Sequence, residues 1–94
     1  MSYQSGNTIK LEAEFRDWSL SDGSQGPLVD PDNIKLIVYD SYYKKLEEIV
    51  IGPANRASEG VYFYFYVFDE PGSYIYEWYG EIDGLPSLIR KRIE

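Results

Sequence analysis

The sequence predicts an all-β protein in which two antiparallel sheets pack face to face. Strand-length segments rich in Val, Ile, Tyr and Phe are separated along the chain by clusters of Gly, Pro, Asp, Asn and Ser, which is typical of strands joined by turns. Aromatic residues, which favour strands, make up 17% of the 94 residues. Strands with one apolar face need a second sheet to cover that face. At this length we expect one domain over 1–94, with 1–7 as a flexible N-terminus and 18–32 as a long loop.

The first predicted strand, 8–16, alternates apolar and charged residues in period 2. We expect its core side to consist of Ile9, Leu11, Ala13 and Phe15, and its outer side of Lys10, Glu12, Glu14 and Arg16. Within the long loop, Leu28 and Val29 are expected to make a brief edge contact. The second and third predicted strands are 33–40, with Ile34, Leu36 and Val38 facing inward, and 46–51.

The fourth predicted strand, 61–68, is apolar on both sides. We expect the core side to be Val61, Phe63, Phe65 and Val67, and the outer side to be Tyr62, Tyr64, Tyr66 and Phe68. We also expect this strand to pair beside the 33–40 strand. The candidate protein interface is therefore one exposed patch made of Tyr62, Tyr64, Tyr66, Ile37 and Tyr39, because tyrosine is enriched at interfaces. Two alternatives stay open: the rings merely cover the sheet, or open strand edges carry the contacts.

The last two predicted strands, 73–82 and 87–93, form a hairpin. Asp83-Gly84 is a two-residue turn signal, and a turn there places Glu77 opposite Arg90 and apolar residues opposite one another on the inner side. Trp78, for example, faces Ile89. The one misfit is Tyr76 opposite Lys91, which a snorkelling lysine would resolve.

The segment before this hairpin resembles the corner of immunoglobulin domains. Their pattern is acid-x-Gly-x-Tyr-x-Cys, and this chain has Glu70-Pro71-Gly72-Ser73-Tyr74-Ile75-Tyr76, with Tyr76 in the place of the cysteine. The resemblance implies that Tyr74 and Tyr76 point inward. It also implies an immunoglobulin-like or fibronectin-like Greek-key β-sandwich of six to seven antiparallel strands.

Composition argues against several classes of function. The chain has no Cys and no His, which removes disulfides, a thiol nucleophile, the usual general base and the commonest transition-metal ligand. Its 16 acidic and 9 basic residues give a net charge of -7, which disfavours a nucleic-acid partner. No apolar run reaches the about 18–20 residues of a membrane helix. The first residues have neither a basic n-region nor an apolar h-region, so we expect no signal peptide. We therefore expect no catalytic residues, no cofactor, no metal and no nucleic-acid or membrane partner.

Three groups of carboxylates bear on this expectation. The loop aspartates Asp17, Asp22, Asp30 and Asp32 could supply oxygen ligands for calcium, but their spacing matches no EF-hand loop and Asp is an ordinary turn residue. Glu47 and Glu48 are adjacent in a strand, so they point to opposite faces and cannot act together as a glycosidase pair would. Glu77 and Glu81 share a face, but Arg90 is expected to keep the nearer one ionised.

Two tryptophans give an alternative function, a carbohydrate- or surface-binding β-sandwich module. Trp18 and Trp78 could form a sugar-stacking platform with surface tyrosines. However, the strand alternation predicts Trp78 in the core, and Trp18 lies at a strand end where it can close the core.

Nearly the whole chain resembles a group of small phage and prophage structural proteins. Their motifs appear here as Val29-Asp30-Pro31, Gly60-Val61-Tyr62-Phe63-Tyr64, Gly72-Ser73-Tyr74-Ile75-Tyr76-Glu77-Trp78 and Gly80-Glu81-Ile82-Asp83-Gly84-Leu85-Pro86. The resemblance implies a non-enzymatic structural protein of the neck, tail or head of a particle. Its partners would be other structural proteins or further copies of itself. It would be a virion component made in the bacterial cytoplasm and not secreted by a signal peptide.

Overall fold

The computed structural model of the chain describes residues 7–17, 26–68 and 72–93. Its elements are β1 Asn7–Glu14, β2 Asp32–Asp40, β3 Lys45–Val50, the 3-10 helix η2 Pro53–Asn55, β4 Arg56–Ser58, β5 Val61–Phe68, β6 Tyr74–Ile82 and β7 Leu85–Ile93. The six predicted strands are present with similar bounds, whereas η2 and β4 lie where the sequence indicated only a connection. The predicted flexible N-terminus, apart from Asn7, and the 18–25 part of the predicted loop lie outside the described residues.

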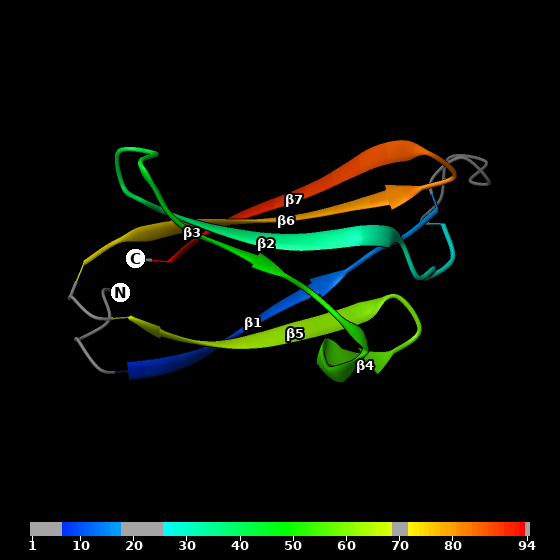
Figure 1. The fold of residues 1–94 in the computed structure, drawn as a ribbon, viewed down its shortest axis with the longest axis horizontal. Helices are drawn as coiled ribbons and strands as arrows, with labels where there is room; N and C mark the ends of the chain where they lie inside the picture. Colours follow the sequence, from blue (N-terminus) through cyan, green and yellow to red (C-terminus); the bar gives the residue numbers. More distant parts are fainter. Residues whose placement is uncertain (1–6, 18–25, 69–71, 94) are drawn as a thin grey trace.

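The strands form two antiparallel sheets that lie as two layers (Figure 1). Among the described residues, one sheet has the strand order β1-β5-β4 and the other has the order β3-β2-β6-β7. The predicted all-β, two-sheet architecture is confirmed. The predicted pairing of the 61–68 strand with the 33–40 strand is wrong, because β5 lies between β1 and β4 while β2 lies in the other sheet.

Side chains from both sheets meet in one core. Trp78 of β6, Leu36 of β2 and Phe15, which follows β1, are all completely buried. The core comprises Leu11, Ala13, Phe15, Ile34, Leu36, Val38, Ile51, Tyr62, Phe68, Tyr74, Tyr76, Trp78 and Ile93. The predicted inward sides of the first two strands are confirmed, and so are the inward positions of Tyr74 and Tyr76.

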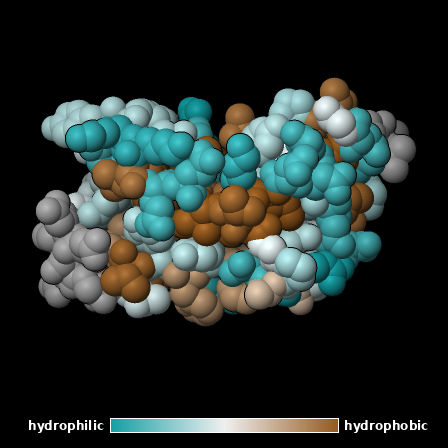
Figure 2. Space-filling view, viewed as in Figure 1, coloured by the Kyte–Doolittle hydropathy of each residue, from teal (hydrophilic) through white to brown (hydrophobic). Residues whose placement is uncertain are grey.

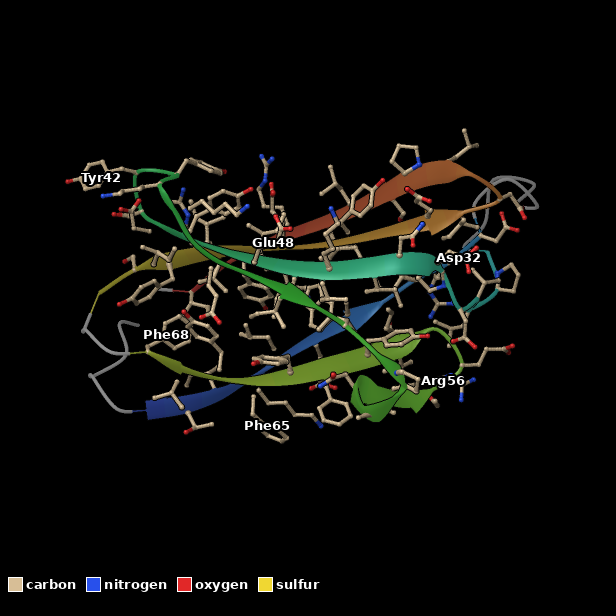
Figure 3. The ribbon with its side chains drawn as sticks, viewed as in Figure 1. Asp32, Tyr42, Glu48, Arg56, Phe65 and Phe68 are labelled. Atoms are coloured by element: carbon tan, nitrogen blue, oxygen red, sulfur yellow. The ribbon has the colours of Figure 1, made fainter. Side chains whose placement is uncertain are left out.

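The two faces of β5 are the reverse of the prediction. Tyr62 and Phe68 are buried, whereas Phe65 and Val67 are 56% and 49% exposed. In Figure 3, Phe68 lies between the layers and Phe65 points away from them. The pairing with β1 explains this result, because residues directly opposite each other share a face of the sheet. The core-facing residues Ile9, Leu11 and Ala13 lie opposite Tyr66, Tyr64 and Tyr62.

The β6–β7 hairpin has the predicted register. Glu77 lies opposite Arg90 and Trp78 lies opposite Ile89. Asp83 and Gly84 have φ values of 53° and 79°, the two positive values that a tight type I′ hairpin turn requires. Lys91, opposite Tyr76, donates from its exposed Nζ to the backbone carbonyl of Glu12 at 3.4 Å, which links β7 to the other sheet.

The connection between β1 and β2 is tied to the turn before β5. Arg16 and Leu28 form an isolated antiparallel bridge, which confirms the expected edge contact. The amide of Phe15 donates to the carbonyl of Gly60 at 2.7 Å. Gly60 has φ +75°, and a Cβ atom there would lie 2.9 Å from Leu28 Cβ and from the Phe15 carbonyl oxygen. Only glycine fits this close approach.

Candidate functional site

The structure does not bring the five predicted interface residues together. Tyr62 is buried, and Tyr64 and Tyr66 are half-buried and pack against the core from the inner face of β5. Ile37 and Tyr39 are half-buried on β2, in the other sheet. The predicted exposed tyrosine patch is therefore wrong, because it required β5 to face outward with its tyrosines and to pair with β2.

The exposed aromatic surface lies instead on the opposite side of β5. We call Val61, Phe63, Phe65 and Val67 the β5 outer row. Phe65 is 56% exposed and Val67 is 49% exposed. The rings of Phe63 and Phe65 meet edge to face with their centroids 5.7 Å apart. This row is a continuous apolar strip on the outer face of the smaller sheet, and exposed apolar strips with polar borders are typical of interaction surfaces.

The outer side of β1 borders this strip with charges. Lys10 lies opposite Phe65, Glu12 opposite Phe63 and Glu14 opposite Val61. Lys10 Nζ is 5.4 Å from the centroid of the Phe63 ring and 3.9 Å from Glu12 Oε2. The Lys10 and Glu12 side chains are 46% and 54% exposed, so they are accessible to a partner.

A second cluster, on the outer face of the larger sheet, surrounds a buried carboxylate. Glu77 accepts hydrogen bonds from Tyr39 Oη at 2.9 Å and from Arg90 Nε at 2.5 Å. Arg90 lies over the ring of Tyr43, 5.3 Å from its centroid. Burial, followed by the hydrogen bond to Glu77, raises the pKa of Tyr39, and the hydrogen bond to Glu77 raises the pKa of Arg90. Both oxygens of Glu77 are engaged, so this cluster fastens β2, β6 and β7 together.

A third cluster surrounds Asp30. Its Oδ1 accepts hydrogen bonds from the amide of Gly60 at 2.8 Å, from Tyr62 Oη at 3.1 Å and from Arg56 Nε at 3.1 Å. Arg56 Nη2 lies 3.0 Å from Asp30 Oδ2. The hydrogen bonds from Arg56 and Gly60 lower the pKa of Asp30 from 3.8 to about 2. Burial and the hydrogen bond to Asp30 raise the pKa of Tyr62. The sequence presented Asp30 as a calcium candidate, but its oxygens are occupied by donors of this chain.

The other carboxylates considered from the sequence do not converge. Glu47 lies opposite the core residue Val38 and Glu48 opposite Ile37, so the two point to opposite faces as predicted. Glu81 accepts hydrogen bonds from Asn33 Nδ2 and Tyr79 Oη, both at 2.9 Å, and these bonds lower its pKa. Asp17 is buried, Asp32 is exposed and Asp22 lies outside the described residues. Within the described part of the chain, no three acidic side chains gather as metal ligands.

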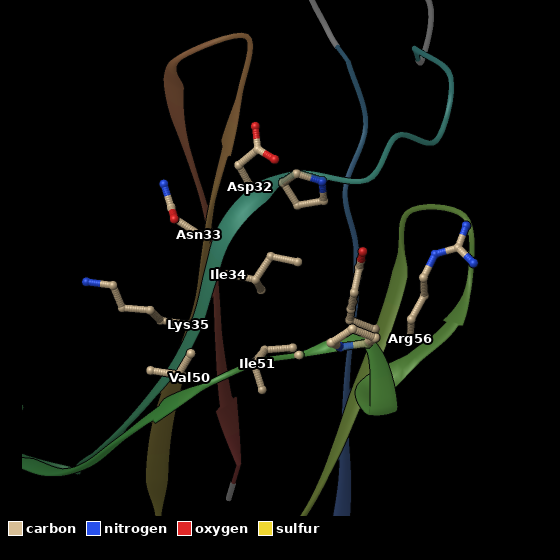
Figure 4. A pocket seen from close by; sticks show the side chains of 11 residues that line it. Asp32, Asn33, Ile34, Lys35, Val50, Ile51 and Arg56 are labelled. Carbon is tan, nitrogen blue, oxygen red and sulfur yellow. The ribbon is translucent and has the colours of Figure 1, made fainter.

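An open hollow of about 530 Å³ lies at one end of the sandwich, between β2, the end of β3 and β5. Figure 4 shows Ile34 and Ile51 pointing into it, with Arg56 on the opposite side. In the space-filling view, apolar surface runs along this side of the molecule between the layers (Figure 2). Charged residues of both signs, including Asp32 and Lys35, line the hollow. Its lining therefore does not select for a ligand of one charge sign.

The fold and the surface define an all-β, two-sheet protein with an exposed aromatic strip. Comparison of the chain with protein-family models, with curated proteins and with solved structures gives no significant match. In the described residues, no helix has the length and hydropathy needed to cross a membrane.

Proposed function

We propose that this chain is a non-enzymatic structural protein of a phage or prophage particle that acts through protein–protein contacts. The observation that carries the proposal is the β5 outer row, a strip of accessible aromatic and aliphatic side chains on a regular sheet face. Burial of such a strip against a partner stabilises an assembly in proportion to the apolar area removed from water. The chain also has no His or Cys, the side chains most used for acid–base and thiol chemistry.

The strand order supports an immunoglobulin-like Greek-key topology for this protein. Immunoglobulin domains place strands B, E and D in one sheet and strands C, F and G in the other, with an added C′ strand next to C in some of them. The orders β1-β5-β4 and β3-β2-β6-β7 follow that arrangement when β1 is taken as strand B. In that topology, Tyr74 and Tyr76, which are buried at the start of β6, would stand at the positions of the corner tyrosine and of the cysteine that follows it.

The motifs on which the proposed resemblance to phage proteins rests have structural roles in this fold. Asp30, from the first motif, binds the Gly60 amide and the Tyr62 hydroxyl of the second. Gly80, from the last motif, lies so close to Pro31 that a Cβ atom on it would be 2.8 Å from Pro31 Cβ. Three of the four motifs thus meet at one end of the sandwich. These contacts hold the fold together, whereas Val61 and Phe63 of the second motif lie on the other face of β5, in the β5 outer row.

The test is to look for the chain in purified particles. Particles from the strain that encodes it would be isolated and their tryptic peptides identified by mass spectrometry. We expect peptides of this chain, such as residues 17–35, in a fixed ratio to the major particle proteins. Incorporation should be lost with Phe65→Ser and retained with Leu88→Ser, which changes a residue of similar exposure on β7. Peptides found in the lysate but never in intact particles would contradict the proposal.

Exposed aromatic rings also support the carbohydrate-binding alternative, since such rings can stack on sugars. Trp78 cannot contribute, because it is fully buried, and Trp18 lies outside the described residues. Phe63 and Phe65 would have to provide the platform. A glycan array probed with the intact chain and with Phe65→Ser distinguishes the two functions: a sugar signal that disappears in the variant would favour this alternative.

A further inference from the structure

The β5 outer row and the charges beside it are arranged so that two copies of the surface complement each other. Eight residues of β1 pair with eight of β5 without a bulge, from Asn7 opposite Phe68 to Glu14 opposite Val61. The outer face of this two-strand unit is therefore regular. Two such faces can stack as sheets do, about 10 Å apart with their strands within about 30° of one another.

The β5 outer row is compatible with a two-fold symmetry axis at its centre. Consider a two-fold axis that lies between the two stacked sheets, perpendicular to the strands, at the level midway between Phe63 and Phe65. The two β5 strands related by this axis are antiparallel. The axis places Phe63 of one copy over Phe65 of the other, and Val61 over Val67. Both ends of the strip then meet apolar residues. This is the self-complementarity that a closed dimer interface requires.

The same axis also matches the charges on β1. Because Lys10 lies opposite Phe65 and Glu12 opposite Phe63, the axis crosses β1 at Leu11. It therefore brings Lys10 of each copy over Glu12 of the other. A two-fold axis along the strands would instead stack β1 on β4 of the second copy, away from Glu12. The β1 charges thus favour the antiparallel arrangement, and opposite charges across an interface fix its register.

We propose that the outer face of the β1–β5 pair is a self-association surface whose occupant is a second, antiparallel copy of this chain. This inference rests on the proposed assembly function and names its first partner. The Phe63 and Phe65 rings of the two copies form the centre of the interface, and two Lys10–Glu12 pairs flank it.

Sedimentation equilibrium of the purified chain with charge-swapped variants tests the proposal. The wild type should form a detectable dimer when its concentration is raised to about 1 mM. Lys10→Glu and Glu12→Lys each place like charges across the axis, and each should weaken the dimer by about tenfold or more, which is about 1.4 kcal/mol. An equimolar mixture of the two variants should form heterodimers, because each interface charge then faces its opposite. The double variant should recover the wild-type dimer for the same reason.

Phe65→Ser should abolish the dimer and Leu88→Ser, on β7, should leave it unchanged, with circular dichroism showing that both remain folded. A monomeric wild type, or a dimer that survives Phe65→Ser and both single charge swaps, would overturn the self-association. Neither result affects detection of the chain in particles, so the proposed function is tested separately. A dimer that Phe65→Ser abolishes but that mixing of the charge variants does not restore would overturn the antiparallel arrangement.

Discussion

The ionisation of Asp30 is closely tied to the folded state. One carboxylate holds the Arg56 guanidinium, the Gly60 amide and the Tyr62 hydroxyl, so it joins the β1–β2 connection to β4 and β5. These donors favour the charged form and lower its pKa to about 2. A pKa that is lower in the folded state than in the unfolded chain gives stability that is complete above the unfolded value and decreases as the pH falls toward the folded value.

We therefore expect the wild type to lose stability between about pH 4 and pH 2, and Asp30→Asn to lose much less over that interval. The variant should also be less stable than the wild type at pH 7, because an uncharged side-chain amide at position 30 binds the Arg56 guanidinium more weakly than the carboxylate does. Urea unfolding followed by tryptophan fluorescence at a series of pH values measures both effects. Asp32→Asn, at an exposed neighbouring position, is the control and should keep the wild-type pH profile. Equal acid sensitivity of Asp30→Asn and the wild type would show that Asp30 is not the responsible group.

At the scale of elements, the orientation of β5 decides which of its side chains form the proposed interaction surface. Phe68 and Phe65 provide a matched pair, since they are the same residue type on opposite faces of this strand, 1% and 56% exposed. Phe68→Ala should reduce the free energy of unfolding by about 3–5 kcal/mol, because it leaves a cavity in the core. Phe65→Ala should reduce it by less than about 1 kcal/mol. Chemical denaturation of both variants measures the difference, and the reverse order of costs would restore the orientation expected from the sequence.

The core-facing side of a strand could be predicted from the sequence where the two sides of the strand differ in chemistry. It could not be predicted where both sides are apolar. In β1, charged and apolar residues alternate, and in the last hairpin the Asp83-Gly84 turn fixes the register, so both elements were predicted correctly. In β5 every residue is apolar or aromatic, so alternation alone gives two equivalent faces. The polar hydroxyls of the tyrosines led to the prediction that they face solvent. In the structure, the hydroxyl of Tyr62 instead donates a hydrogen bond to Asp30, which is far from it in the chain. Only knowledge that β5 pairs with β1 would have resolved its orientation.

The β6–β7 turn gives a second prediction at this scale. Gly84 has φ +79°, a conformation that is strained for any residue with a side chain, although nothing lies within 4 Å of its Cβ position. Gly84→Ala should therefore cost about 1 kcal/mol through the backbone alone. Gly52 has equally open surroundings but an ordinary φ of -121°, so Gly52→Ala should change the stability by less than about 0.5 kcal/mol. Thermal unfolding of the two variants compares these costs, and equal values would show that the strain at Gly84 is relieved by a change in the turn.

For the whole molecule, the shared core implies that the two sheets unfold as one unit. Leu36 of β2 is completely buried in the same cluster as Leu11 of β1 and Tyr62 of β5, and Lys91 of β7 bonds to the backbone of β1. Domains of this size usually unfold in one cooperative step, and local stability is then shared by the elements that pack on a common core.

Leu36→Ala should accordingly lower the free energy of unfolding by about 2–5 kcal/mol, and the loss should extend beyond its own sheet. Hydrogen exchange measured by mass spectrometry should show faster exchange of the β1 and β5 amides by the same factor as those of β2 and β6. Leu88→Ala, at an exposed position of β7, is the control and should leave the exchange rates in all four strands unchanged.

If exchange accelerated only in β2, β3, β6 and β7, the smaller sheet would be a separate cooperative unit. The proposed self-association surface on β1 and β5 would then be formed independently of the larger sheet. Coupled exchange would mean instead that every core substitution also weakens that surface.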